Sequence, residues 1–142
     1  MAIIKREALV PYTPKQMYDL VNDVEQYPKF LPWCSQSVLH SKTEDELKAT
    51  LTLAWKGLQK SFTTVNRLQQ DKMIELRLVD GPFHHLEGFW RFETLEEQCK
   101  VSLDMEFEFA GKLISLAFGP VFSQVAHSLV DAFCKRAAEL YG

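Results

Sequence analysis

The sequence has few cysteines, and none of them stands in a metal-binding arrangement. Its three cysteines, Cys34, Cys99 and Cys134, are far apart, and no CxxC pair occurs. An odd number of widely spaced cysteines predicts reduced thiols, and neither a disulfide framework nor a zinc site. We therefore expect a protein of a reducing compartment, the cytoplasm.

Long apolar runs are missing as well. No stretch of about 18 consecutive apolar residues occurs, which is the length that a membrane-spanning helix needs. The N-terminal segment MAIIKREALVPY has too short an apolar run for a secretory signal. The sequence therefore predicts no transmembrane segment.

The chain has no excess of positive charge. It contains 16 Lys and Arg against 19 Asp and Glu, which gives a net charge of −3. Nucleic acids and anionic membranes attract proteins through clustered cations, so the composition predicts no DNA partner. The length of 142 residues fits a single domain, residues 1–142, with one core.

Catalytic signatures are absent too. The chain has no GxGxxG, P-loop, HExxH or GxSxG motif. The adjacent His84 and His85 would point to opposite faces of a strand, so their spacing alone cannot chelate a metal. Asp80, His84 and Glu87 could form an acid/base group, but a polar turn between two strands explains them better. We expect a protein that is not an enzyme, with no catalytic residue, no metal and no required cofactor.

The N-terminal third contains one strand pattern and two helix starts. The β-branched segment 2–10 predicts a strand. TPKQ (13–16) combines a capping Thr, a Pro at the first helical position and a Gln that completes a capping box. DVEQ (23–26) repeats the capping signature, so we expect a second short helix, which must end near Pro28.

From about residue 36 to residue 109 the hydrophobic pattern has a period of two. Such alternation is typical of antiparallel strands with one buried and one solvated face. We expect about six strands in this region and about seven in all. The apolar positions are Leu47, Ala49, Leu51, Leu53 and Trp55, then Ile74, Leu76 and Leu78, then Val101, Leu103, Met105, Phe107 and Phe109.

A long helix ends the chain. Gly119 and Pro120 indicate its start, and its length of about 21 residues would span roughly 30 Å. Its apolar stripe is Phe122, Val125, Ala126, Leu129, Val130, Phe133, Ala137 and Leu140. The order of elements predicts an α+β fold, in which a curved antiparallel sheet wraps around this helix.

An incomplete fit between the sheet and the helix would leave a cavity, and two apolar segments could close its ends. YPKFLPWC (27–34) is a loop with two prolines that is as apolar as a core, and LISLAFG (113–119) lies before the predicted helix. We predict that 27–34 is a rim or lid, and that some large apolar side chains line a pocket for a hydrophobic ligand. The candidates for the lining or rim are Phe30, Trp33, Leu51, Leu53, Trp55, Phe62, Leu76, Trp90, Phe92, Met105, Phe107, Phe118, Phe122, Val125 and Leu129.

Three segments in order resemble a known family. They are ALVPYTPKQMYDLVNDVEQYPKFLPWC (8–34), VDGPFHHLEGFWRFE (79–93) and FEFAGKLISLAFGPVF (107–122). Together they resemble the coenzyme Q-binding branch of the START-like, helix-grip superfamily, over nearly the whole chain. The positions that match the family motifs are Tyr27, Pro28, Phe30, Leu31, Pro32, Cys34, Gly81, Pro82, Phe83, Leu86, Gly88, Trp90 and Phe92.

The resemblance implies a non-enzymatic, ligand-binding domain and leaves two functions open. The first is binding of ubiquinone or a lipid in support of respiration, in the cytoplasm or at the periphery of the inner membrane. The second is the activity of family members described as type II toxins, which bind the large ribosomal subunit and block subunit association. One fold hosts many functions, so both remain hypotheses. We place ubiquinone binding first, because a negative net charge disfavours contact with ribosomal RNA.

Overall fold

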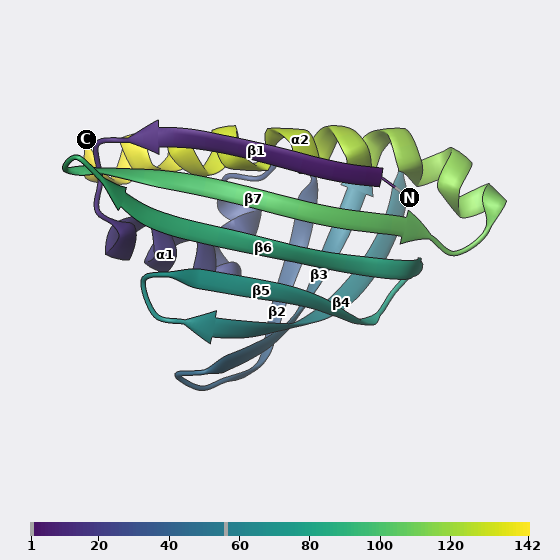
Figure 1. The fold of residues 1–142 in the computed structure, drawn as a ribbon. Coiled ribbons are helices and arrows are strands. Elements are labelled where there is room, and N and C mark those ends of the chain that lie inside the picture. The colour runs from purple at the N-terminus through teal and green to yellow at the C-terminus, as the bar shows by residue number, and fades with distance from the viewer. Residues whose placement is uncertain (1, 56) are drawn as a thin grey trace.

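The computed structural model describes residues 2–55 and 57–142, and it has the predicted α+β architecture. The chain runs through β1 (Ala2–Val10), α1 (Pro14–Asn22) and a 3-10 helix, η1 (Val24–Lys29), before six consecutive strands and a long helix, α2 (Lys112–Tyr141) (Figure 1). The six strands are β2 (Cys34–Lys42), β3 (Glu46–Trp55), β4 (Leu58–Gln69), β5 (Met73–Asp80), β6 (Phe83–Leu95) and β7 (Gln98–Phe109).

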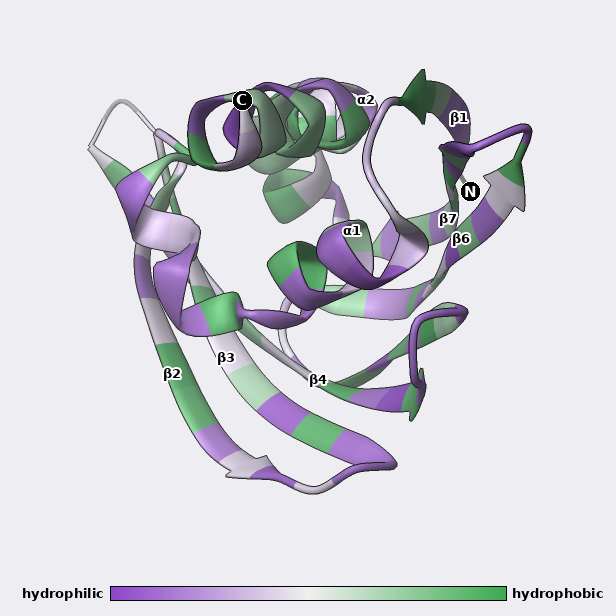
Figure 2. Ribbon diagram, turned by 90° about the vertical axis from the view of Figure 1, so that its left-hand side faces the viewer, coloured by the Kyte–Doolittle hydropathy of each residue, from purple (hydrophilic) through white to green (hydrophobic). Residues whose placement is uncertain are grey.

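All seven strands form one antiparallel sheet in the order β1-β7-β6-β5-β4-β3-β2. The first strand therefore pairs with the last one, and every other pair is a hairpin between neighbours in sequence. Figure 2 shows the sheet curving around α1 and α2, which lie on its concave side. This arrangement confirms the predicted sheet that grips a long helix.

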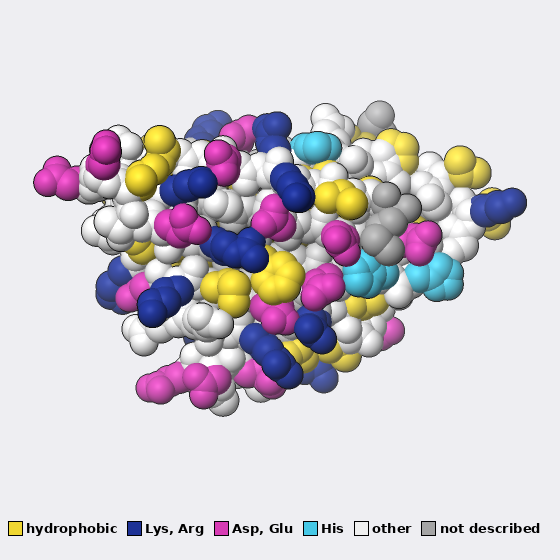
Figure 3. Space-filling view, viewed as in Figure 1, with side chains coloured by type: hydrophobic (Ala, Val, Ile, Leu, Met, Phe, Trp, Pro, Cys, Tyr) yellow, Lys and Arg dark blue, Asp and Glu magenta, His cyan; other side chains and the backbone are white. Residues whose placement is uncertain are grey.

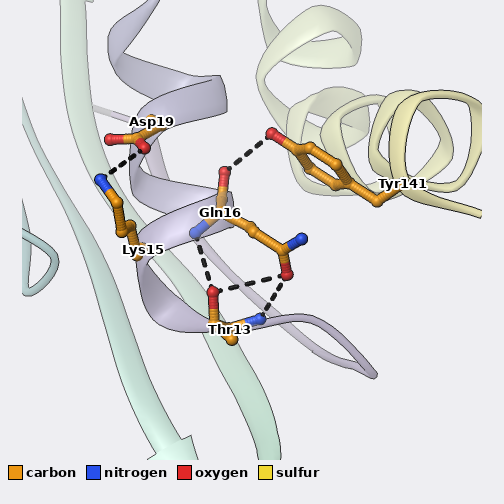
Figure 4. Close-up of polar contacts among 5 residues, drawn as sticks. All are labelled: Thr13, Lys15, Gln16, Asp19 and Tyr141. Atoms are coloured by element: carbon orange, nitrogen blue, oxygen red, sulfur yellow. Dashed lines mark hydrogen bonds and ion pairs between the residues drawn. The ribbon is translucent and has the colours of Figure 1, made fainter.

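Helix α1 begins with the predicted capping box. The backbone N–H of Gln16 donates to the hydroxyl of Thr13 (3.1 Å), and the N–H of Thr13 donates to the side-chain oxygen of Gln16 (2.9 Å) (Figure 4). The hydroxyl of Tyr141 donates to the carbonyl of Gln16 (3.3 Å), so the last turn of α2 is joined to the first turn of α1. The two capping bonds satisfy N–H groups that a helix start leaves without partners.

The second capping signature does not form a cap. The helix η1 is present, but the Asp23 side chain makes no capping hydrogen bond to it. Asp23 ends α1, and its backbone N–H donates to the carbonyl of Leu20 (3.4 Å). Its φ of −86° and ψ of 70° differ from the extended conformation that an N-cap residue normally adopts.

Helix α2 begins earlier than the sequence predicts. It starts at Lys112 and includes Pro120, so the segment 113–119 is helical and does not form a separate apolar loop. Proline hinders a helix partly by clashing with the Cβ of the preceding residue, and Gly119 has no Cβ. The prediction that the helix starts at Gly119 and Pro120 is therefore wrong.

The alternating strand residues form the core with one exception. Leu47, Leu53, Val101 and Leu103 are buried, but Trp55 is 38% exposed. Trp55 has the phase of the concave face, but it is the last residue of β3, where the strand turns into β4. Trp55 therefore lies outside both the buried core and the cavity lining, although the alternation placed it on the apolar face.

By length and composition alone, α2 is the one helix of the described residues that could cross a membrane. In the structure it packs against β1, β7 and α1, and its stripe includes the buried side chains of Phe122, Val130 and Phe133. A core helix passes the same test, so the test gives only weak support for a membrane span.

Candidate ligand cavity between the sheet and helix α2

An apolar cavity of about 70 Å³ lies between the concave face of the sheet and α2. The sheet and the helices both contribute to its wall. The lining residues are Val21, Val24, Tyr27, Trp33, Ala49, Leu51, Phe62, Thr64, Asn66, Ile74, Leu76, Leu86, Trp90, Met105, Phe122, Val125, Ala126, Leu129 and Phe133.

An aromatic cluster bounds the cavity on the side of Phe122. The ring of Phe122 lies 4.8 Å from Phe107, 5.1 Å from Phe83 and 6.0 Å from Phe62, measured between centroids. Phe83 also stacks on Phe109 at 4.6 Å. Edge-on and stacked rings pack closely, and they occupy space that a ligand would need.

The segment predicted as the loop 27–34 contains the end of η1 and the first residue of β2, so only residues 30–33 form a connection. It bounds the cavity on another side and is anchored by hydrogen bonds. The hydroxyl of Tyr27 donates to the carbonyl of Val21, and the N–H of Ala54 on β3 donates to the carbonyl of Trp33 (2.8 Å). Trp33 is only 7% exposed. The loop therefore contributes a buried wall, and Trp33 belongs to the cavity lining and not to an exposed rim.

The cavity is small for the ligands that the sequence suggests. Pockets for small molecules usually measure about 300–1,000 Å³. A volume of about 70 Å³ leaves room for a few water molecules. A quinone head group would enter only if the surrounding side chains moved apart.

Two polar side chains of β4 interrupt the apolar lining. The hydroxyl of Thr64 donates to the side-chain oxygen of Asn66 (2.8 Å), and Asn66 is buried. A buried polar group is costly unless it is hydrogen-bonded, and this pair partly meets that need. It could recognise a polar atom inside the cavity.

The structure brings together most of the predicted cavity residues. Those in the lining are Trp33, Leu51, Phe62, Leu76, Trp90, Met105, Phe122, Val125 and Leu129. Leu53, Phe92, Phe107 and Phe118 are buried but lie outside the lining. Phe30 is half-buried and packs on Phe133 at 5.4 Å and under the guanidinium of Arg136 at 5.2 Å.

The lining also includes residues that the sequence-based set lacks. They are Val21, Val24, Tyr27, Ala49, Thr64, Asn66, Ile74, Leu86, Ala126 and Phe133. Ala126 and Phe133 belong to the predicted helix stripe, and Ala49 and Ile74 have the phase of the concave face, so periodicity could have found them. Thr64 and Asn66 follow the same phase on β4, but they were not predicted to line the cavity because they are polar.

The buried thiols and the Tyr27 phenol favour their neutral forms. Burial raises the pKa of Cys34 from the ordinary value of 9.0 to about 11, and it has the same effect on Cys99. Burial also raises the pKa of Tyr27. At neutral pH these groups are protonated, and a protonated thiol is a poor nucleophile.

The outer face of the sheet carries charges of both signs. Figure 3 shows Lys and Arg interspersed with Asp and Glu on this side. Arg91 pairs with Asp104 at 2.7 Å, and Arg77 pairs with Glu75 at 2.9 Å. Lys48 and Arg67 lie on the same face and form no ion pair with another described residue.

A second, open hollow of about 580 Å³ lies beside the first turns of α2. Ala2, Phe107, Phe109 and Leu116 form part of its wall. Leu113 and Leu116 are 84% and 77% exposed, so this end of α2 presents apolar side chains to solvent.

The fold and its cavity agree with a family comparison. The model of the family described as "Polyketide cyclase / dehydrase and lipid transport" matches residues 10–134. The chain belongs to this START-like family. The recognition made from the three sequence segments is thereby confirmed.

Curated relatives within the family carry a more specific name. Proteins named "Ribosome association toxin RatA" are 48% identical in Pseudomonas aeruginosa, over 98% of this chain and 97% of the relative, and 46% identical in Escherichia coli K12, over 99% and 90%. A Xenopus laevis protein named "Coenzyme Q-binding protein COQ10 homolog B, mitochondrial" is 31% identical over 92% of this chain and 56% of the relative.

Solved structures support the same fold. An 18 kDa protein from Caulobacter crescentus is 30% identical, with a TM-score of 0.77 over 100% of this chain and 99% of that one. The Zhui aromatase/cyclase from Streptomyces is 17% identical, with a TM-score of 0.79 over 96% and 93%. At that identity the likeness to the family's cyclases concerns the fold alone.

Proposed function

We propose that this protein is a non-enzymatic ribosome-associating factor of the RatA type, which binds the large ribosomal subunit and hinders its joining to the small one. The observation that carries the proposal is 45–48% identity to proteins named as ribosome association toxins, over at least nine-tenths of both chains. This reverses the order of the two functions given by the sequence alone. A ribosomal partner would also keep the protein in the cytoplasm.

The small volume of the cavity supports this order. A volume of about 70 Å³ is well below the usual range for small-molecule pockets. The match to the coenzyme Q-binding relative is lower in identity and covers only 56% of that protein. Both observations favour a function at the surface over one inside the cavity.

The outer sheet face offers a way to contact RNA despite the negative net charge. Lys48 on β3 and Arg67 on β4 belong to adjacent strands, and Glu46 is the register partner of Arg67. Neither cation forms an ion pair with another described residue, although Arg67 lies between its register partners Glu46 and Glu75, so both can exchange counterions at a phosphate. We therefore assign the ribosome contact to the part of the outer face around these two side chains.

The test measures subunit joining by sedimentation. Purified large and small subunits are mixed with excess protein, and the yield of joined ribosomes should fall. The double variant Lys48→Glu/Arg67→Glu should lose most of the effect. Lys135→Glu/Lys29→Glu changes the net charge equally at exposed positions of the helices, and it should keep the effect.

Unchanged joining with a large excess of wild-type protein would overturn the proposal. Equal activity of the two double variants would overturn the assigned face while leaving ribosome binding intact. Raising the salt concentration should weaken the wild-type effect, because phosphate contacts release counterions.

Binding of a hydrophobic ligand is the second candidate, because the cavity is apolar and includes Trp33 and Trp90 in its wall. Native mass spectrometry of the purified protein would detect a retained quinone or lipid. Ala49→Val adds apolar volume to the cavity wall at a strand position that suits a β-branched residue. This variant should abolish ligand retention and leave subunit joining unaffected, which separates the two functions.

A further inference from the structure

Three side chains with metal-binding atoms meet on the outer face of the sheet. His85 and Glu87 lie two residues apart on β6, so they share a face, and Glu106 on β7 is the register partner of Glu87. One ligand atom from each residue lies within 4.8 Å of the other two. The sequence around His84 and His85 could not predict this group, because Glu106 belongs to another strand.

The imidazole is directed at both carboxylates. Nε2 of His85 lies 3.4 Å from Oε2 of Glu106 and 4.0 Å from Oε2 of Glu87. This nitrogen is buried and has no hydrogen-bond partner among the described residues. A tetrahedral cation with ligand bonds of about 2.0–2.2 Å sets its ligand atoms roughly 3.3–3.6 Å apart. The His85–Glu106 separation falls in that range, and a small rotation of the Glu87 side chain would complete the set.

The two carboxylates need a positive partner. Like charges directly opposite each other on neighbouring strands are destabilising, and Glu87 faces Glu106 in this way. Arg77 supplies part of the compensation, but its guanidinium lies 3.8 Å from Oε1 of Glu87, the oxygen that does not face His85. The Oε2 atoms of both glutamates therefore stay available to a ligand next to His85. Arg77 contacts the other oxygen of Glu87 and can thereby orient this side chain.

We propose that His85, Glu87 and Glu106 form a binding site for a divalent transition-metal cation of the zinc type. One imidazole and two carboxylates are suitable ligands for such a cation, and water would complete a four-coordinate shell. The bound cation would neutralise the opposed glutamates and join β6 to β7. The site lies on the convex side, away from the cavity, and the proposal is independent of ribosome binding.

The test is calorimetric titration of chelator-treated protein with zinc chloride, in a buffer that does not bind the metal. We expect one site in the wild type. His85→Ala and Glu106→Gln should each weaken binding at least tenfold. Glu46→Gln removes an exposed carboxylate of β3, a strand that is adjacent to neither β6 nor β7, and it should change the affinity less than twofold. Cys134→Ser is a further control, which shows whether the half-buried Cys134 thiol contributes to zinc binding.

A second readout does not depend on heats of binding. Zinc should raise the thermal midpoint of the wild type and of Glu46→Gln, and it should leave that of His85→Ala unchanged. Circular dichroism confirms that each variant folds. His85→Asn serves if the alanine variant does not fold. Equal zinc affinity in the wild type and the His85 variant would overturn the proposal, as would no binding by the wild type at millimolar zinc. If the wild type does not bind zinc, His85, Glu87 and Glu106 form an ion-pair cluster and no metal site.

Discussion

The rings of Phe133 on α2 and Trp90 on β6 meet edge to face, with their centroids 5.3 Å apart. Phe133 also packs against Tyr27 at 5.3 Å and Phe30 at 5.4 Å. One side chain therefore joins the long helix, the sheet and the loop 27–34. The stability of the cavity wall and the position of the loop depend on the same contact.

Truncation of this side chain should be costly. Phe133 is 1% exposed, so Phe133→Ala should lower the free energy of unfolding by about 3–5 kcal/mol. Leu140→Ala removes an apolar side chain that is 51% exposed on the same helix, and it should change the free energy by less than about 0.5 kcal/mol. Urea denaturation measures both, and a small effect of Phe133→Ala would mean that α2 does not hold the loop.

The cap of α1 should make a smaller contribution. Thr13→Ala removes the hydroxyl that accepts from Gln16, and it should cost about 0.5–2 kcal/mol. Thr13→Ser keeps a hydroxyl and should retain most of the stability. If both variants unfold at the same denaturant concentration, the hydrogen bond to the hydroxyl contributes little.

Stability should fall at alkaline pH. Burial raises the pKa of Cys34 and Cys99 from 9.0 to about 11, so the unfolded chain loses these protons first as the pH rises. The stabilisation is fully present below pH 9 and is lost between about pH 9 and pH 11. Burial also raises the pKa of Tyr27, which adds to the same trend.

Denaturation at a series of pH values checks this dependence. In Cys99→Ala the free energy of unfolding should start lower, because a buried side chain is truncated, and it should then decline less steeply than in the wild type. An identical slope in the two proteins would show that the Cys99 thiol does not titrate differently in the folded and unfolded states.

Trp33 offers a test of the cavity itself. Its burial means that Trp33→Ala should lower stability by about 3–5 kcal/mol and also enlarge the space next to Tyr27. If the cavity is a ligand site, short-chain ubiquinone should bind the variant with altered affinity. Calorimetry that finds the same ubiquinone affinity in the variant and the wild type would mean that Trp33 does not contact the ligand.

The fold could be predicted from sequence because its signals are local and periodic. The alternation from Val101 to Phe109 and the stripe from Phe122 to Phe133 each identify an element and its buried face. The start of α2 could not be predicted, since Pro120 usually ends or begins a helix and the tolerance given by Gly119 depends on context. Trp55 was misplaced because alternation does not report where a strand ends.

The candidate sites were less predictable. Periodicity finds which side chains face inward, but it cannot say how much space they leave, and the cluster around Phe122 leaves little. The meeting of His85 with Glu106 depends on the register between β6 and β7, which is a property of the folded sheet. The polar pair Thr64 and Asn66 follows the buried phase of β4, although polar residues usually indicate a solvated face.

The pairing of β1 with β7 also bears on how the chain acquires its structure during synthesis. Ala2 lies opposite Phe107 in the register, so the partner of the first strand is made roughly one hundred residues later, about 5–20 s at ordinary rates of elongation. Contacts so distant in sequence form slowly. Until β7 is made, β1 has no partner on either edge, and even in the folded sheet it remains an edge strand with exposed Ile3 and Leu9. The nascent chain is therefore most vulnerable to mispairing just before its last strand and helix emerge, and a chaperone that shields the N-terminal strand would act at that stage.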